Sequence, residues 1–317
     1  MGILASEFGN LRRFSWLTDG GQLVVEATDS PVSAVLTSFF EAYDEAFVLP
    51  NEKEKLQGFE ECLALNQGEL YASLSSCYGP FREIVLVMRD GPPGTLIGGA
   101  NLIAFPLELA EKTILSLNLN YLFVQPCHRR RGYLAEMVKA VQFVARSAFE
   151  PPALSLPLIT FIEQNDPLRM SSEDYERDTA HSGLDQFKRI EIWSKLGARI
   201  VDFEYVQPAL SPDQRPDTSL VYAVLGAEDR TLDPCLLLEH LRRFFGISVL
   251  KGKDLASDAT ASSLLGELSA SCARGDKIPL LSIQGLPFSS RQIMDKANVP
   301  NLRALLKTTV KRRKAAL

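Results

Sequence analysis

The chain has 317 residues, of which 46% are hydrophobic and 23% charged, and this globular composition excludes wholesale disorder and a membrane-bundle protein. The 34 basic and 39 acidic residues give a net charge of −5, which disfavours non-specific attraction to nucleic acid or anionic membranes. Five widely spaced cysteines and three histidines predict neither a disulfide scaffold nor a metal site. No apolar run approaches the ~20 residues of a membrane span, so we expect a cytoplasmic protein.

Strands and helices are predicted from hydrophobic periodicity and from turn residues. The predicted strands cover 23–27, 82–89, 95–105, 116–124, 154–162, 201–206 and 219–225. The predicted helices cover about 31–46, 51–65, 133–149, 187–196, 233–246 and 258–274, and a further helix begins at 301. The second and third strands form a hairpin about the turn at 90–94, and the helix at 133–149 lies in a crossover between two strands.

Helix starts are predicted from capping residues. Asp29 or Ser30 caps the first helix because Pro31 suits the first helical position, and Asn51 opens the second helix in a pattern like a capping box. Asp233 caps the first helix of the C-terminal part in the same way. The sequence shows no internal repeat.

The pattern changes from mixed α/β to helices after residue 226, which predicts two domains, 1–226 and a helical region at 227–317. The amphipathic helix at 233–245 must bury its apolar face, either on the main domain or on another subunit. A homodimer therefore stays open as an alternative.

The segment 124–134, VQPCHRRRGYL, lies between a predicted strand and a predicted helix. The first N–H groups of a helix have no intrahelical partner, and the helix dipole adds partial positive charge there. Three consecutive arginines strengthen the attraction for an anion, and Gly132 lets the main chain approach a phosphate closely. The segment therefore predicts a diphosphate site.

This segment resembles the central signature of the GNAT superfamily, the acyl-CoA-dependent N-acetyltransferases. The residues that match its spacing are Val124, Pro126, Arg129 and Gly132. A second stretch, WSKLGA at 193–198, resembles a helix end of the family, and the predicted elements at about 20–226 follow the family's order. The resemblance implies an α/β fold with a mixed, mostly antiparallel sheet, a central splayed parallel strand pair flanked by helices, and here a C-terminal mainly helical extension.

The resemblance also implies acetyl-CoA as co-substrate. The pyrophosphate would bind the loop, the pantetheine arm would lie along the preceding strand, and an asparagine would stand beside the thioester. Carried over to this chain, the coenzyme-binding residues are Leu122, Phe123, Val124, Arg129, Arg130, Arg131, Gly132, Tyr133, Leu134 and Asn165. The chain departs from the family at Leu134, where Gly or Ala is preferred, and at Trp193, where many members have a tyrosine that acts as general acid.

Candidate acid and base residues follow from the chemistry, since an ammonium must lose a proton before its nitrogen attacks a thioester. Glu163 is the first choice for the base, with Asp166 next, and Tyr205 is a candidate acid. Asn120 stands near the position of a family glutamate and can orient water without taking a proton. The seven acids of 163–185 form either a loop that attracts a cationic amine or a solvated surface loop.

The resemblance thus implies an N-acetyltransferase that moves an acetyl group to a primary amine of a small molecule or peptide by direct transfer. The departures leave a second hypothesis, a non-catalytic acyl-CoA-binding or sensor module with a degenerate site.

Overall fold

The computed structural model describes residues 4–8, 11–18, 21–91, 94–109, 112–149, 155–211, 213–284 and 299–315. The chain forms two compact units, each made of three segments that alternate along the sequence. Unit 1 comprises Met1–Phe47, Lys53–Leu158 and Arg243–Lys253. Unit 2 comprises Val48–Glu52, Ile159–Arg242 and Asp254–Leu317. The predicted boundary at 226 does not coincide with this division, and as a domain boundary it stays a prediction.

Unit 1 contains an antiparallel meander in which each strand pairs with the next along the chain. Its strands are β1 (Leu4–Phe8), β2 (Leu11–Thr18), β3 (Gly21–Thr28), β4 (Arg82–Asp90), β5 (Thr95–Glu108) and β6 (Thr113–Val124). The sequence analysis missed β1 and β2. Strands β5 and β6 approach so closely that a Cβ on Gly98 would lie 2.1 Å from the carbonyl oxygen of Phe123, so only glycine fits there.

Four helices accompany these strands: α1 (Ala34–Ala46), α2 (Leu56–Ala64), α3 (Gly68–Tyr78) and α4 (Tyr133–Ser147). The cap of α1 is Ser33, whose hydroxyl accepts the Val35 N–H, so the predicted caps Asp29 and Ser30 are wrong. Helix α2 begins after Lys55 rather than Asn51, and α3 was not predicted. Neither Lys55 before α2 nor Gln67 before α3 makes a side-chain cap hydrogen bond, so capping residues do not reveal where these helices begin.

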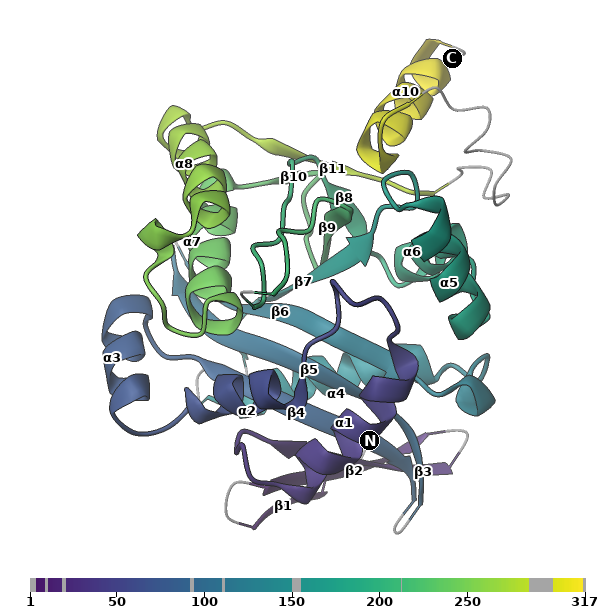
Figure 1. Cartoon of the computed structure of the whole chain (residues 1–317), viewed down its shortest axis with the longest axis vertical. Helices are drawn as coiled ribbons and strands as arrows, with labels where there is room; N and C mark the ends of the chain where they lie inside the picture. The colour runs from purple at the N-terminus through teal and green to yellow at the C-terminus, as the bar shows by residue number, and fades with distance from the viewer. Residues whose placement is uncertain are drawn as a thin grey trace. The chain divides into compact units, whose positions relative to one another are not determined.

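Figure 1 shows α1 and α2 in front of the strands of unit 1 and α4 behind them. The front face holds an aromatic core in which Tyr43 of α1 contacts Phe59 of α2 and Tyr121 of β6, with ring centroids 4.9 and 4.8 Å apart. Each fully buried aromatic side chain contributes roughly 2–3 kcal/mol through burial. This core fixes the end of β6, where the predicted coenzyme segment begins.

Unit 2 has its own antiparallel strands in the order β7-β9-β8-β11-β10. They are β7 (Leu158–Asn165), β8 (Arg199–Val201), β9 (Leu220–Leu225), β10 (Thr231–Leu232) and β11 (Ile278–Leu281). The predicted strand 201–206 overlaps β8 at Val201 alone, and β10 and β11 were not predicted. The C-terminal region therefore adds two strands to helices that the sequence did predict.

The helices of this part are α5 (Ser172–Ser182), α6 (Gln186–Lys195), α7 (Pro234–Phe244), α8 (Ala259–Arg274) and α10 (Leu302–Ala315). Helix α5 lies in the acidic segment that the sequence analysis treated as a loop. Ser171 caps it, and Glu173 and Asp174 in its first turn suit the helix dipole. Gly246 does not end α7, because a π-helical turn at Phe245–Val249 continues it.

The sequence analysis predicted no disulfide scaffold, and the described residues contain one disulfide that it did not foresee. Cys235 of α7 and Cys272 of α8 form a disulfide with an S–S distance of 2.02 Å. The residues are 37 apart in sequence, so their pairing depends on how the two helices pack, which spacing alone does not reveal.

The predicted fold class is confirmed as a mixed, mostly antiparallel α/β fold with helices on the strands and a largely helical C-terminal part. Strands β6 and β7 belong to different units, and the splay expected between them stays a prediction. In the part of the chain that the structure describes, no helix is both long and apolar enough to cross a membrane.

Candidate functional site

The predicted phosphate segment connects β6 to α4 within unit 1. A single helical turn at Pro126–His128 follows the strand, and α4 begins at Tyr133 with Gly132 as its cap. Gly132 has φ 81°, the left-handed region that favours glycine, and a Cβ built there would meet nothing within 4 Å. The space over this turn is open, so a diphosphate can reach the main chain.

Arg130 also lies in the left-handed region, with φ 63°, although it carries a side chain. Such a conformation costs about 1–2 kcal/mol and persists where the surroundings require it. Here it reverses the chain so that Arg130, Arg131 and Gly132 are exposed just before the helix. The cost is consistent with a turn shaped for binding.

The three arginines do not have equivalent roles. The Nε of Arg129 donates to the Val124 carbonyl, 3.0 Å away, so this side chain closes the loop onto the strand. Arg130 and Arg131 extend from the exposed turn, where their charge is available to an anion. Tyr133 packs edge-on against His128, with ring centroids 6.1 Å apart, and Leu134 is partly buried in the first turn of α4.

The last residues of β6 alternate in burial. Phe123 is 6% exposed and packs in the aromatic core, whereas Leu122 and Val124 are partly exposed. All three pair with β5, so one edge of β6 is occupied and its other backbone groups face away from β5. An extended pantetheine arm could use such groups as an added strand would.

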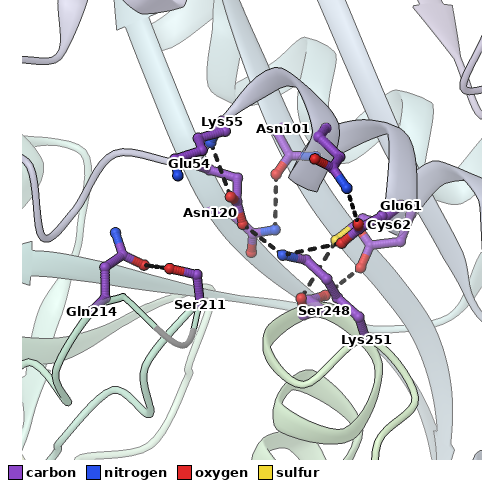
Figure 2. Close-up of polar contacts among 12 residues, drawn as sticks. Glu54, Lys55, Glu61, Cys62, Asn101, Asn120, Ser211, Gln214, Ser248 and Lys251 are labelled. Carbon is purple, nitrogen blue, oxygen red and sulfur yellow. Dashed lines mark hydrogen bonds and ion pairs between the residues drawn. The ribbon is translucent and has the colours of Figure 1, made fainter.

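Asn120 belongs to a chain of three amides on β5 and β6. The Nδ2 of Asn118 donates to Oδ1 of Asn120 at 2.8 Å, and Nδ2 of Asn120 donates to Oδ1 of Asn101 at 2.9 Å. Asn101 in turn donates to the Ile84 carbonyl at 3.2 Å. Figure 2 shows Asn120 directed at Asn101. The strand pairing shifts by one residue beside Asn101, which leaves Asn120 as the extra residue of a β-bulge.

A second polar cluster of unit 1 surrounds Lys251, which follows the π-helical turn. Its Nζ lies 3.0 Å from a carboxylate oxygen of Glu54 and 3.8 Å from one of Glu61 (Figure 2). Burial lowers the pKa of Lys251, but these carboxylates outweigh burial and the net pKa is raised. Lys251 is therefore a cation whose charge is balanced inside the unit.

Glu83 lies in the same cluster and is fully buried. Ser248 donates its hydroxyl to one carboxyl oxygen of Glu83, and among the described residues the other oxygen has no hydrogen-bond partner. Burial raises the pKa of Glu83 to about 8, despite the opposing effects of Ser248 and Lys251. Glu83 is therefore predominantly neutral at pH 7.

Unit 2 brings together two predicted catalytic residues. Tyr205 donates its hydroxyl to Oε1 of Glu163, and Gln207 lies 3.5 Å from Oε2. Burial raises the pKa of Glu163 to about 7, against the hydrogen bond from Tyr205, which lowers it, and Asp217 raises it further. A carboxyl with this pKa exchanges a proton near neutral pH, as a general base requires.

Tyr205 is less suited to donate its proton. Burial, with the adjacent Glu163 carboxyl, raises the pKa of Tyr205 well above its usual range. Its ring stacks on Tyr222 with centroids 4.6 Å apart, and the hydroxyl of Tyr222 lies 2.7 Å from Nε2 of His240. The phenol therefore serves better as a hydrogen-bond donor to Glu163 than as an acid.

Asn165 lies at the end of β7, two residues after Glu163 and on the same face of the strand. Its side chain hydrogen-bonds Glu52, which the sequence analysis did not single out. Burial raises the pKa of Glu52 to about 8, and the neighbouring carboxylates of Asp217 and Asp178 raise it further. Nothing local in the sequence identifies Glu52, because it lies more than a hundred residues from these partners.

The remaining acidic candidates have structural roles. Asp166 accepts the N–H groups of Leu168 and Leu302, so it anchors the start of α10 and is a poor second base. Asp178 is buried against Arg189, 2.8 Å away. In the described chain, no group of three His, Cys, Asp or Glu residues is placed to hold a metal ion.

No family model matches the chain, and no curated protein matches it. It is similar to solved structures of GNAT acetyltransferases. One is NAA60 of Arabidopsis thaliana in complex with acetyl-CoA, at 13% identity over 65% of this chain and 99% of that chain, with a TM-score of 0.38.

Two others are the ribosomal-protein-S18-alanine N-acetyltransferase of Escherichia coli and an aminoglycoside acetyltransferase from an uncultured soil metagenomic sample. The first has 14% identity over 64% of this chain and 92% of that chain, with a TM-score of 0.30. The second has 21% identity over 55% and 90%, with a TM-score of 0.28. Similarities of this size assign no activity or substrate.

Proposed function

We propose that the chain is an acetyl-CoA-dependent N-acetyltransferase that moves an acetyl group to a primary amine of a small molecule or peptide. The observation that carries the proposal is the turn between β6 and α4. Two left-handed positions, Arg130 and Gly132, present an exposed helix N-terminus beside arginine charge at the end of a strand. This is an anion site continuous with an extended backbone.

In this proposal the pyrophosphate of the coenzyme binds the N–H groups of Gly132, Tyr133 and Leu134, which have no acceptor within the helix. The pantetheine arm then follows the backbone of β6 along Leu122 and Phe123. The loop fits the group because no Cβ projects from Gly132 into the open space, and because two arginines balance the phosphate charge.

The acceptor is a cation before reaction, so one proton must leave its ammonium group. Glu163 is the proposed base, supported by its pKa near 7 and by Tyr205, which keeps one of its oxygens oriented. The neutral nitrogen attacks the thioester carbonyl, the C–S bond breaks, and the departing thiolate takes the second proton, which the nitrogen loses as the amide forms. The products are the acetylated amine and coenzyme A.

Cationic amines are the proposed acceptor class because Asp217 adds carboxylate charge beside Glu163 and Glu52, whose pKa values it raises. Asp178 is paired with Arg189, so not every acid of the segment 163–185 contributes to this attraction. Residues 1–226 remain the proposed transferase domain, with 227–317 as its helical extension.

The test is calorimetric titration of acetyl-CoA into the wild type and Gly132→Glu. We expect a Kd of ~100 μM or tighter, abolished by the glutamate because it repels the diphosphate. Gly132→Ala carries the same backbone strain without charge, and Gly183→Glu places the same change at another left-handed helix cap, at φ 63° in unit 2. Both controls should bind.

An amine-acceptor screen then separates the two hypotheses. Transfer to any amine supports the enzyme. Binding without transfer to any amine favours the non-catalytic acyl-CoA module, for which Trp193 and the tightly held Tyr205 proton are the supporting features. Binding of neither acetyl-CoA nor coenzyme A contradicts both.

A further inference from the structure

The amide chain of unit 1 has one hydrogen-bond direction. A backbone carbonyl can only accept, so the Ile84 oxygen requires the NH₂ group of Asn101 to face it. Oδ1 of Asn101 then faces Asn120 and can only accept its N–H. The Ile84 carbonyl therefore determines which end of the Asn101 and Asn120 amides is the nitrogen and which is the oxygen.

The direction passes on to the third amide. Because Asn120 turns its nitrogen to Asn101, its oxygen faces Asn118, which donates to it. Asn101 and Asn118 are buried at 4% and 0% exposure, whereas Asn120 is partly exposed. The two buried amides therefore hold a third, accessible one by both ends.

An amide nitrogen carries two N–H groups and the bond to Asn101 uses one, so a second N–H remains on this partly exposed side chain. Asn118 and Asn120 lie two residues apart on β6, and the hydrogen bond between their side chains places both on one face of the strand. A neutral donor held in this way suits an oxygen that gains negative charge during a reaction, because no reorganisation is needed.

We propose that Asn120 donates this N–H to the carbonyl oxygen of the acetyl thioester, and that Asn101 and Asn118 are positioning residues for it. The proposal rests on the proposed function. Asn120 lies four residues before Val124 on the strand along which the pantetheine arm would run back from the loop, about 13 Å at ~3.3 Å per residue. At that distance from the diphosphate, the acyl end of the ligand would lie beside Asn120.

Coenzyme A lacks the carbonyl, so the affinities of acetyl-CoA and coenzyme A together isolate this hydrogen bond. Both ligands are titrated by calorimetry into the wild type, Asn120→Asp, Asn120→Ala and Asn101→Leu. We expect each variant to lose at least fivefold in acetyl-CoA affinity while coenzyme A affinity stays within twofold. Gln67→Glu makes the same amide-to-acid exchange at an exposed site of unit 1 and should change neither affinity.

Turnover gives a second readout. With the best acceptor, kcat should fall 10- to 100-fold in Asn120→Ala with the pH profile unchanged, because an amide does not titrate. If the Asn101 variant does not fold, Asn120→Ala, at the partly exposed position, still tests the inference. If the ratio of acetyl-CoA affinity to coenzyme A affinity is the same in the variants as in the wild type, the inference is wrong and the proposed function stands. If the wild type binds neither ligand, both are wrong.

Discussion

Each unit contains a row of polar side chains in contact with one another, and the two rows differ in chemistry. In unit 1, Asn118, Asn120 and Asn101 form a chain of amides that cannot gain or lose a proton. In unit 2, Glu163 accepts from Tyr205, which stacks on Tyr222, whose hydroxyl contacts His240, and the carboxyl of Glu163 can gain or lose a proton near neutral pH. The amides suit orientation of a polar bond, and the carboxyl suits movement of a proton.

Burial also raises the pKa of a carboxyl group in each unit, and the groups around it differ. It brings the pKa of Glu163 to about 7, where the group changes charge near neutral pH. It brings the pKa of Glu83 in unit 1 to about 8, where the carboxyl is mostly uncharged and accepts a hydrogen bond from Ser248. Similar desolvation thus yields a candidate base in one unit and a structural group in the other.

The largest expected effect is on turnover by Glu163→Gln, which should lower kcat by about 10²–10³ because no other group there takes the proton as readily. In the wild type, kcat/KM should rise with pH and level off above about 7, since the ionised carboxyl is the active form. A pH–rate profile measures both. Retention of the same inflection in the variant would contradict the assignment.

Tyr205→Phe is the matched variant for this prediction. It removes the hydrogen bond that lowers the pKa of Glu163, so the inflection should move to higher pH while the plateau is retained. An unshifted profile would show that the two side chains do not interact in solution.

The next effect is on stability, through the disulfide that joins α7 to α8 in unit 2. Closing 37 residues of chain restricts the unfolded state, so replacing Cys235 and Cys272 by serine should lower the free energy of unfolding by roughly 3–4 kcal/mol. Urea unfolding with and without reductant measures it. The exposed thiol Cys77 gives the control Cys77→Ser, which should change nothing. A wild type insensitive to reductant would refute the prediction.

A smaller, pH-dependent effect is expected at Glu83. Its folded pKa of about 8 lies above the ordinary 4.5, so the stability it contributes is complete below about 4.5 and lost as pH rises through about 8. Between pH 6 and pH 8 the wild type should lose about 2 kcal/mol that Glu83→Gln retains. Denaturant unfolding at several pH values tests this. Glu41→Gln, at an exposed carboxyl outside this cluster, should leave the wild-type slope unchanged.

The smallest effect is expected in the coenzyme loop. Arg130→Gly relieves a left-handed side chain and should stabilise the protein by ~1 kcal/mol, while weakening acetyl-CoA binding severalfold through the lost charge. Arg131→Gly removes the same charge without that relief, so it should weaken binding and not stabilise. Equal melting temperatures for the two variants would show that Arg130 is not strained.

Local patterns were enough to find the loop and the elements around it. The end of β6, the left-handed Gly132 and the start of α4 follow from residues a few positions apart, as does the cap of α8 by Asp258. Where capping signals recur, as at Ser30 and Ser33, local reading chose the wrong residue because tertiary packing decides where a helix begins.

What the sequence by itself determined about this protein is the glycine turn that opens α4 and the order of most elements, since both depend on contacts within a few residues. Only the tertiary structure decided the contacts between Asn120 and Asn101, 19 residues apart, and between Glu163 and Tyr205, 42 apart. The Cys235–Cys272 pair, 37 apart, belongs with them. Such contacts form when strands and helices pack, and a buried carboxyl acquires its pKa only in that packed surrounding.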